Sequence, residues 1–321
     1  MHVQANLKAL RTAIPYIRAY KGGVFVVKLG GALCDPGRTL DHIAEQLALL
    51  HQVGIRVVLV HGAGEQATAL SRRLGQAPDI FAGRRITDDA TLEVCKMAFA
   101  GTVNTNLLAT LRTFGVPAVG LSGIDGGLIT ATRRPVQTVT DPSTGATRQV
   151  DFGHVGDIAQ VNPAAVEHLL AGGYVPVVCS LAADDAGNIL NVNADTIATR
   201  LAIGLRAVKY FLVTNVDGVM DNPADPGTLH AYLDLDEMQR LIERGVVGGG
   251  MLPKLAACAA ALRGGVARVH IVNGTASDAL LAEVFTNEGS GTLIVARRDA
   301  GVADKASPAS EPGCLQPGLG P

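Results

Sequence analysis

Val24–Leu33, VFVVKLGGAL, is the stretch around which the fold of this chain is organised. It starts with an apolar, β-branched run that is typical of a buried strand. Lys28 stands where this strand becomes a loop, and Gly30 and Gly31 follow it. Paired glycines let a ligand approach the backbone, and they leave N–H groups for anionic oxygens. The stretch taken alone therefore predicts a phosphate site, or equally a plain buried strand with an ordinary turn.

The length and composition limit the classes of protein to which this chain can belong. The 321 residues are enough for one large α/β domain or two lobes, and 48% hydrophobic residues allow a substantial core. The formal charge is −2 without a basic run, which argues against nucleic acid as the main partner. No apolar stretch reaches the roughly 18 residues of a membrane span. The N-terminus lacks a signal-peptide pattern, so we expect a cytoplasmic protein.

The cysteines predict no cross-linked framework. The 5 cysteines (Cys34, Cys95, Cys179, Cys258 and Cys314) are scattered and show no CxxC spacing. Buried free thiols are therefore expected, with neither disulfides nor a zinc site.

Hydrophobic periodicity predicts alternating strands and helices, and hence a mostly parallel sheet covered on both faces. An amphipathic helix over 3–20, which Pro15 is expected to kink or divide, comes first. Residues 128–158 predict projecting hairpins that could form a lid, and 297–321 a disordered tail. The expected strands are 24–28, 56–60, 118–121, 174–179, 209–214, 268–272 and 292–295. The expected helices are 40–51, 65–74, 89–100 and 104–114 (as one helix or two), 163–170, 195–205, 251–263 and 279–285.

The second strand ends in HGAG (61–64), and HGAGEQA is a weak form of the dinucleotide-binding fingerprint. That fingerprint requires an acidic strand end about 20 residues further on. Instead, Pro78–Asp88 is polar and carries the adjacent pair Arg84 and Arg85. A dehydrogenase is therefore the weakest alternative. A phosphate or carboxylate site remains, because backbone N–H groups at a helix start attract any anion.

Two later stretches also indicate a binding site. Asn191, Asn193 and Asp195 alternate before a helix, and N-capping needs only one of them. In GVVGGGMLPK (245–254), consecutive glycines indicate close approach or mobility. Lys254 lies near a helix N-terminus, where the dipole favours anions. Either a bound anion compensates for this lysine, or the lysine is simply solvated.

Together these motifs resemble the amino acid kinase family, and within it the N-acetylglutamate kinases. The resemblance runs from about Ile14 to Val295 and implies an open αβα sandwich with a mostly parallel, about eight-stranded sheet. It implies an N-terminal oligomerisation helix at 1–22 and a kinase domain at 23–296, with an acyl-amino-acid lobe and a nucleotide lobe that meet near 180–190. The segments are VVKLGG (26–31), VLVHGAG (58–64), GRRITD (83–88), VGLSGIDGG (119–127), HVGDI (154–158), NVNADT (191–196), VTNVDGVM (213–220), GGGMLPK (248–254) and VFTNEGSGT (284–292).

The resemblance implies transfer of the γ-phosphoryl group of MgATP to the side-chain carboxylate of N-acetyl-L-glutamate in arginine biosynthesis. The magnesium is carried by ATP, and no protein-bound metal is expected. By position, Lys28 and Lys254 are the transition-state lysines and Asp195 orients them. The resemblance assigns substrate binding to Ala63, Gly64, Arg85, Asn191 and Asn193. Nucleotide binding falls on Gly30, Gly31, Asn215, Val216, Asp217, Gly218, Val219, Met220, Val246, Val247 and Gly248.

Two positions depart from the family pattern. Ala63 replaces the middle glycine of its motif, so its methyl group is expected to narrow the pocket and to disfavour positive φ. Asn215 replaces a usual aspartate. A kinase for N-acetyl-2-aminoadipate, or for a carrier-bound analogue on a lysine route, therefore stays open. So does a non-catalytic amino-acid or nucleotide sensor on the same fold.

Some members of this subfamily are inhibited by arginine and assemble as hexamers through an N-terminal helix. This chain carries such a helix, which includes Tyr16. Lys209, His270, Glu283 and Gly289 stand at positions that resemble the arginine site. The resemblance implies an arginine-sensitive hexamer built as a trimer of dimers, with a non-inhibited dimer as the alternative.

Overall fold

The fold is built on one eight-stranded sheet. The computed structural model describes residues 2–141 and 144–298, with side chains from residue 11 onward. Neighbouring strands are parallel except β15 and β16, which are antiparallel, so the predicted mostly parallel sheet is confirmed. The strand order is β14 (Tyr232–Asp234), β16 (Thr292–Val295), β15 (Arg268–Asn273), β13 (Lys209–Thr214), β1 (Val24–Leu29), β2 (Arg56–His61), β10 (Val175–Val178) and β5 (Ala118–Leu121).

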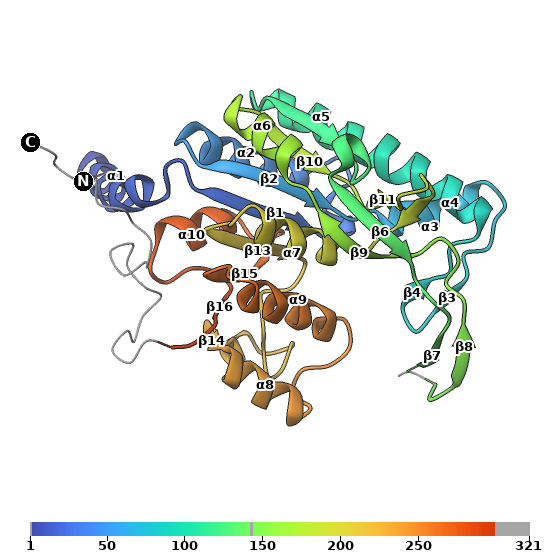
Figure 1. Cartoon of the computed structure of the whole chain (residues 1–321). Coiled ribbons are helices and arrows are strands. Elements are labelled where there is room, and N and C mark those ends of the chain that lie inside the picture. Colours follow the sequence, from blue (N-terminus) through green and yellow to red (C-terminus); the bar gives the residue numbers. More distant parts are fainter. Residues whose placement is uncertain (1, 142–143, 299–321) are drawn as a thin grey trace, which may run out of the picture.

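Helices cover both faces of this sheet, and the alternation of side chains along β1 separates two cores (Figure 1). Phe25, Val27 and Leu29 pack with one set of helices, whereas Val24 and Val26 pack with the other. The first set is α1 (His2–Tyr20), α2 (Arg38–Gln52), α3 (Gly64–Arg73), α4 (Asp89–Lys96), α5 (Asn104–Thr113) and α10 (Ala279–Phe285). The second set is α6 (Ala164–Ala171), α7 (Ala194–Gly204), α8 (Leu235–Glu243) and α9 (Met251–Arg263).

A smaller sheet and two hairpins extend the main sheet on one side (Figure 1). The smaller sheet has the order β12 (Ile189–Asn191), β11 (Leu181–Ala183), β6 (Ile129–Arg133) and β9 (Gly156–Val161). The hairpins are β3 (Ile80–Phe81) with β4 (Arg84–Arg85), and β7 (Gln137–Thr140) with β8 (Thr147–Val150). The guanidinium of Arg148 lies 4.0 Å from the centroid of the Phe81 ring and ties the two hairpins together. The hairpins expected within 128–158 are confirmed.

Three local features add to or differ from what the sequence predicted. Helix α1 runs through Pro15 without being divided, and Tyr16 and Tyr20, which follow the proline, are buried against the core. A π-helical segment, Met97–Val103, joins α4 to α5, so the stretch that was predicted as one or two helices is continuous, with a π-helical part that was not predicted. Strand β14 and helix α8 were not predicted, although α8 begins with a capping box between Asp234 and Glu237.

The described cysteines are buried free thiols, as expected: Cys34, Cys95, Cys179 and Cys258. Cys314 and most of the expected tail lie outside the described residues. Within the described ranges, no helix is long and apolar enough to cross a membrane. The same ranges contain no cluster of three or more His, Cys, Asp or Glu side chains that could hold a metal ion.

Candidate active site

The glycine turns after β1 and β2 meet at one edge of the sheet. The two strands are parallel neighbours, so their carboxyl ends lie side by side. A Cβ atom added at Gly31 would lie 3.5 Å from the nitrogen of Gly64 and 3.6 Å from the Cα of Ala63. One added at Gly62 would lie 3.7 Å from the Cβ of Ala194, at the start of α7. These turns and the first turn of α7 therefore lie against one another.

Lys28 points into this region because of its position in β1. Side chains alternate along β1, so Lys28 points, like Val24 and Val26, to the face that α7 and α9 cover. The residue is 8% exposed. Its Nζ lies 2.7 Å from Oδ1 of Asp195, in the first turn of α7. An ion pair this well buried is stronger than one in water, because less solvent screens it. The structure thus brings together two residues that are far apart in the sequence.

Lys254 lies on the same face, in the first turn of α9. Its Nζ donates to the carbonyl of Gly250 at 3.3 Å, and its side chain is half-buried. Helix α9 packs against α7. Burial raises the pKa of the Cys258 thiol, one turn after Lys254; the charge of Asp195 raises it further and that of Lys254 opposes the rise. The charges of Asp195 and Lys254 therefore both act on Cys258, between α7 and α9.

Arg85 reaches the glycine turn from the β3–β4 hairpin. Its Nη2 donates to the carbonyl of Gly64 at 2.8 Å and to Oγ1 of Thr68 at 2.5 Å. Its Nη1 is buried and has no hydrogen-bond partner in the described part of the chain. A buried guanidinium nitrogen with an unused donor can bind an incoming carboxylate.

The alternating polar residues before α7 have three different partners. Asn191 donates from Nδ2 to Oγ1 of the buried Thr87 at 3.2 Å, which links it to the segment that carries Arg85. Asn193 accepts from the backbone N–H of Thr196 at 3.1 Å and is the N-cap of α7. Capping therefore accounts for one of the three.

Ala63 does not need a positive φ in this turn. Its φ is −152° and its ψ is 34°, outside the left-handed region that favours glycine. Its side chain is 1% exposed and packs in the core with α3. The expected backbone strain is therefore absent.

The predicted nucleotide segment, Asn215–Met220, is fixed against the ends of β15 and β16. Asn273 donates to Oδ1 of Asp217 at 2.7 Å, and the N–H of Val219 donates to Oγ1 of Thr292 at 2.8 Å. Gly218 has φ +148°, and a Cβ there would lie 2.4 Å from Oγ1 of Thr292. Only glycine fits this turn. The second predicted segment, Val246–Gly248, lies in the loop between α8 and α9, where Val247 is buried.

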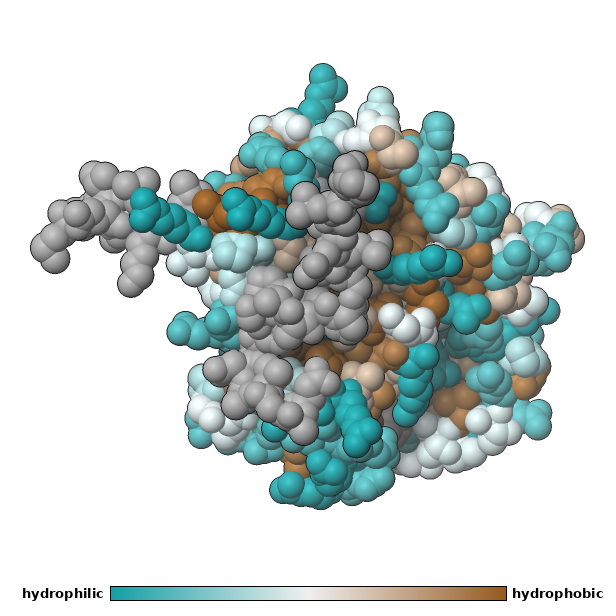
Figure 2. All heavy atoms as spheres, turned by 60° about the vertical axis from the view of Figure 1, so that its left-hand side comes forward, coloured by the Kyte–Doolittle hydropathy of each residue, from teal (hydrophilic) through white to brown (hydrophobic). Residues whose placement is uncertain are grey.

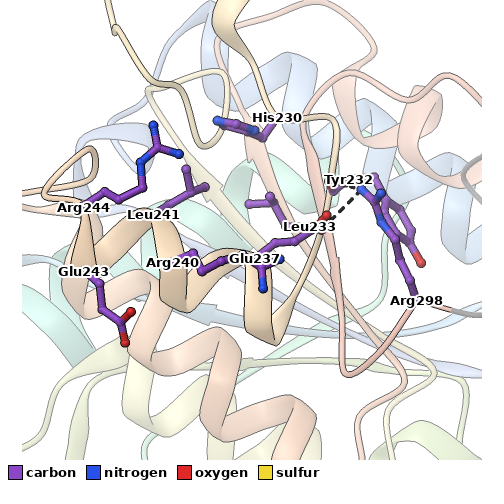
Figure 3. A pocket seen from close by; sticks show the side chains of 9 residues that line it. All are labelled: His230, Tyr232, Leu233, Glu237, Arg240, Leu241, Glu243, Arg244 and Arg298. Atoms are coloured by element: carbon purple, nitrogen blue, oxygen red, sulfur yellow. Dashed lines mark hydrogen bonds and ion pairs between the residues drawn. The ribbon is translucent and has the colours of Figure 1, made fainter.

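A groove of about 430 Å³ lies between β14 and α8 (Figure 3). Arg298 stacks over the ring of Tyr232 at 4.8 Å and lies 3.3 Å from a carboxylate oxygen of Glu237. The N–H of His230 donates to the carbonyl of Val219 at 2.8 Å, so this groove adjoins the nucleotide segment. This groove was not predicted, because the charged residues of α8 look like an ordinary solvated helix face in the sequence. The lining residues are His230, Tyr232, Leu233, Glu237, Arg240, Leu241, Glu243, Arg244 and Arg298.

The residues assigned to an arginine site also come together. Tyr16, Lys209, His270 and Glu283 line a small cavity between α1, α10 and the sheet. Nδ1 of His270 lies 2.7 Å from Oε2 of Glu283, and Nζ of Lys209 lies 3.4 Å from Nε2 of His270. Gly289 does not line the cavity. Lys209 begins β13, so this cavity lies at the opposite edge of the sheet from the glycine turns.

Comparisons with known proteins agree with this geometry. The model of the amino acid kinase family matches residues 23–273. An acetylglutamate kinase of Myxococcus xanthus is 45% identical, over 89% of this chain and 93% of its own length. One of Methanocaldococcus jannaschii is 40% identical, over 89% and 94% respectively.

Solved structures show the same fold. N-acetylglutamate synthase from Neisseria gonorrhoeae, complexed with coenzyme A and N-acetyl-glutamate, superposes with a TM-score of 0.76 at 33% identity. The match covers 91% of this chain but only 64% of that protein. The same synthase was also solved with coenzyme A and L-arginine. Carbamate kinase from Giardia superposes with a TM-score of 0.61 at 17% identity, which supports the fold alone.

Proposed function

The chain belongs to the amino acid kinase family, and on this premise we propose that it is an acetylglutamate kinase. The reaction moves the γ-phosphoryl group of ATP to the side-chain carboxylate of N-acetyl-L-glutamate and yields an acyl phosphate and ADP. The observation that carries the proposal is the buried pair of Lys28 and Asp195, 2.7 Å apart, beside two facing glycine turns. A sensor on the same fold would have no need for this pair together with Lys254.

The chemistry fits a site that lacks a general base. A carboxylate is already ionised at neutral pH, so the protein has only to position two anions and neutralise charge on the transferring group. Lys28 and Lys254 supply the positive charge from neighbouring elements. Asp195 reduces their mutual repulsion and fixes the direction of Lys28. The unused Nη1 of Arg85 is proposed to hold the α-carboxylate of the substrate.

MgATP is proposed to lie along the ends of β1 and β13. Gly30 and Gly31 would face its phosphates, while Asn215–Met220 and Val246–Gly248 would border the nucleoside. The chain has no G-x-x-x-x-G-K-[ST] sequence, so a P-loop does not hold the nucleotide. Magnesium would enter with ATP and neutralise charge on the β- and γ-phosphates.

The length of the acceptor tests the proposal. ADP release is measured with N-acetyl-L-glutamate and with N-acetyl-L-2-aminoadipate, which is longer by one methylene. We expect turnover with the shorter acid and at least about tenfold lower kcat/KM with the longer one, because one methylene is worth 10–200-fold in a fitted pocket. Turnover with the longer acid alone would assign the protein to a lysine route. Absence of turnover with both would favour a carrier-bound acceptor or a sensor.

We also propose that arginine inhibits the enzyme through the cavity lined by Tyr16, Lys209, His270 and Glu283. The buried carboxylate of Glu283 can attract a guanidinium group, and a similar synthase has been solved with L-arginine. The cavity measures only about 10 Å³, room for about one water molecule. Arginine would therefore have to displace α1, which carries Tyr16. Inhibition that survives Glu283→Gln unchanged would contradict this proposal.

The oligomer is proposed to be a hexamer joined through α1. The face that carries α1 shows apolar surface among polar residues (Figure 2), and Ile14 on this helix is 36% exposed. A helix that links subunits and also covers the arginine cavity would couple assembly to inhibition. The cytoplasm is the compartment that we propose for this biosynthetic role.

A further inference from the structure

A buried polar pair lies beneath the turn that follows β2. His61 is the last residue of β2 and is fully buried. Its Nε2 lies 3.0 Å from Nδ2 of Asn104, and its Nδ1 lies 3.4 Å from the carbonyl oxygen of Gly62. Asn104 begins α5 and is 5% exposed. The hydrogen bonds of these two side chains connect them to each other and to the backbone, so the proposed chemistry does not explain their role.

The hydrogen bonds fix the tautomer of His61. Nδ2 of Asn104 also donates to the carbonyl of Val177 at 3.1 Å, and a carbonyl can only accept. The amide nitrogen therefore faces both partners, and Nε2 of His61 must be the acceptor. A neutral imidazole with an accepting Nε2 carries its hydrogen on Nδ1. Nδ1 thus donates to the carbonyl of Gly62. Burial lowers the pKa of His61 to about 4, so the ring is neutral at physiological pH.

The amide of Asn104 packs closely against β5. A Cβ added at Gly120 on β5 would lie 2.1 Å from Oδ1 of Asn104, so only glycine accommodates the amide there. The side chain of Ser180 holds the preceding carbonyl, because its Oγ donates to the carbonyl of His61 at 2.8 Å. The carbonyls of His61 and Gly62 are therefore both held by buried donors.

A held carbonyl also directs the N–H on the other side of its peptide bond. The peptide between Gly62 and Ala63 is trans, as are all peptides in the described residues. In a trans peptide the C=O and N–H bonds point in opposite directions within one plane. Fixing the Gly62 carbonyl toward His61 thus aims the Ala63 N–H away from the core. This N–H stands at the start of α3, where helix geometry supplies no partner for it.

We propose that His61, held by Asn104, is a positioning residue that fixes the peptide between Gly62 and Ala63 and aims the Ala63 N–H at the acylamino-acid substrate. This inference rests on the proposed function, because it needs that substrate in this turn. It assigns to His61 no contact with substrate or ATP. Its effect should appear in the binding of the acylamino acid and not in that of ATP.

Two uncharged variants distinguish the effect of the hydrogen-bond donor at Nδ1 from the effect of the size of the ring. His61→Asn keeps an N–H near the position of Nδ1, whereas His61→Gln keeps an acceptor toward Asn104 and offers Gly62 no donor. We expect His61→Gln to raise KM for N-acetyl-L-glutamate about tenfold, the value of one well-placed hydrogen bond, with KM for ATP unchanged. His61→Asn should restore KM to within about threefold of wild type.

Equal effects of the two variants on KM for the acylamino acid would overturn the proposal, and so would a parallel rise in KM for ATP. A merely structural role predicts such equality, because both variants lose the buried ring. Urea unfolding of both variants shows whether their stabilities are matched. Wild-type protein that phosphorylates no acylamino acid would instead remove the proposed function itself. Turnover by wild type combined with equal variants would overturn this inference alone.

A second measurement uses the wild-type protein and so does not depend on whether a variant folds. Nitrogen-15 NMR of the full chain, labelled at histidine, reports which ring nitrogen carries hydrogen. At pH 7 we expect the His61 signals to show a protonated Nδ1 and a bare Nε2, unchanged down to about pH 5. A protonated Nε2, or titration of the ring near its ordinary pKa, would overturn the proposal.

Discussion

Lys28 owes its place in the site to the alternation of one strand. Because successive side chains of β1 point to opposite faces, Lys28 joins the face of α7 and α9 while Leu29 joins the other core. The sequence could predict this lysine, since it interrupts an apolar run just before two glycines. The strand pattern alone could not predict the 2.7 Å pair with Asp195, which only the family resemblance implied, because that contact depends on how α7 is placed over the sheet.

Other residue roles were invisible in the sequence for the same reason. His61 reads as a strand residue before a glycine turn, and only the packing of α5 brings Asn104 to its ring. Asn193 looked like a member of a binding triplet, yet its side chain caps α7. A local pattern reveals which residue types are available, whereas the partner of each is decided by tertiary contacts.

Lys254→Ala tests the second lysine. Because Lys254 is proposed to neutralise charge that develops in the transition state, we expect kcat to fall about 10²–10³-fold. The dissociation constant for N-acetyl-L-glutamate, measured by calorimetry, should stay within about threefold, since the substrate carboxylate is held elsewhere. Lys96→Ala is the matched control, because Lys96 pairs with Glu93 on α4. Unchanged turnover in Lys254→Ala would exclude Lys254 from the mechanism.

The buried His61 should make stability depend on pH. Its pKa falls from 6.5 to about 4 on folding, so the unfolded chain binds the extra proton first as pH falls. The stabilisation is complete above pH 6.5 and is lost toward pH 4, by roughly 3 kcal/mol in total. Urea unfolding at pH 7 and pH 5 measures it. His61→Asn should lose less stability between these two values than wild type does. Equal losses would show that His61 is not the group responsible.

At the scale of secondary-structure elements, the predicted bounds were most accurate where the hydrophobic periodicity extended over several residues. Strands β1, β13 and β16 and helices α2 and α9 lie within about a residue or two of their expected bounds. The short strands β3, β4, β11, β12 and β14 were missed, because two or three residues carry no readable alternation. The π-helical segment Met97–Val103 was also missed, since it preserves helical burial while changing the backbone pattern.

The cap of α7 can be separated from substrate binding. Asn193→Ala should cost about 1 kcal/mol of unfolding free energy, because Thr196 loses its backbone acceptor. Asn193→Ser, a neutral cap of similar strength, should restore stability and leave KM for N-acetyl-L-glutamate unchanged. Urea unfolding and steady-state kinetics give the two readings. A Ser variant with normal stability but a raised KM would show that the Asn193 amide binds substrate.

At the scale of the whole molecule, the two proposed sites lie at opposite edges of the sheet. The glycine turns follow the carboxyl ends of β1 and β2, whereas Lys209 begins β13 beside α1. Figure 1 shows α1 at the far end of the molecule from the β3–β4 and β7–β8 hairpins. A signal from α1 would therefore have to cross the rigid sheet or pass through the assembly of subunits.

Removal of residues 1–20 tests that organisation. Because α1 is the proposed link between subunits, we expect the hexamer to dissociate and inhibition by arginine to disappear while turnover remains. Light scattering coupled to gel filtration gives the mass. Since the deletion also uncovers Tyr16 and Tyr20, Ile14→Asp provides a milder test at a 36% exposed position. A hexamer that persists in both variants would place the assembly interface elsewhere.

The central claim is that the phosphoryl acceptor is a carboxylate, and trapping the product tests it most directly. The protein is incubated with MgATP, hydroxylamine and N-acetyl-L-glutamate, and the hydroxamate is measured against ADP by mass spectrometry. We predict one hydroxamate for each ADP, and none with N-acetyl-L-glutamine, which lacks the ionised carboxylate. ADP release without hydroxamate from N-acetyl-L-glutamate, or an equal yield with N-acetyl-L-glutamine, would contradict the account.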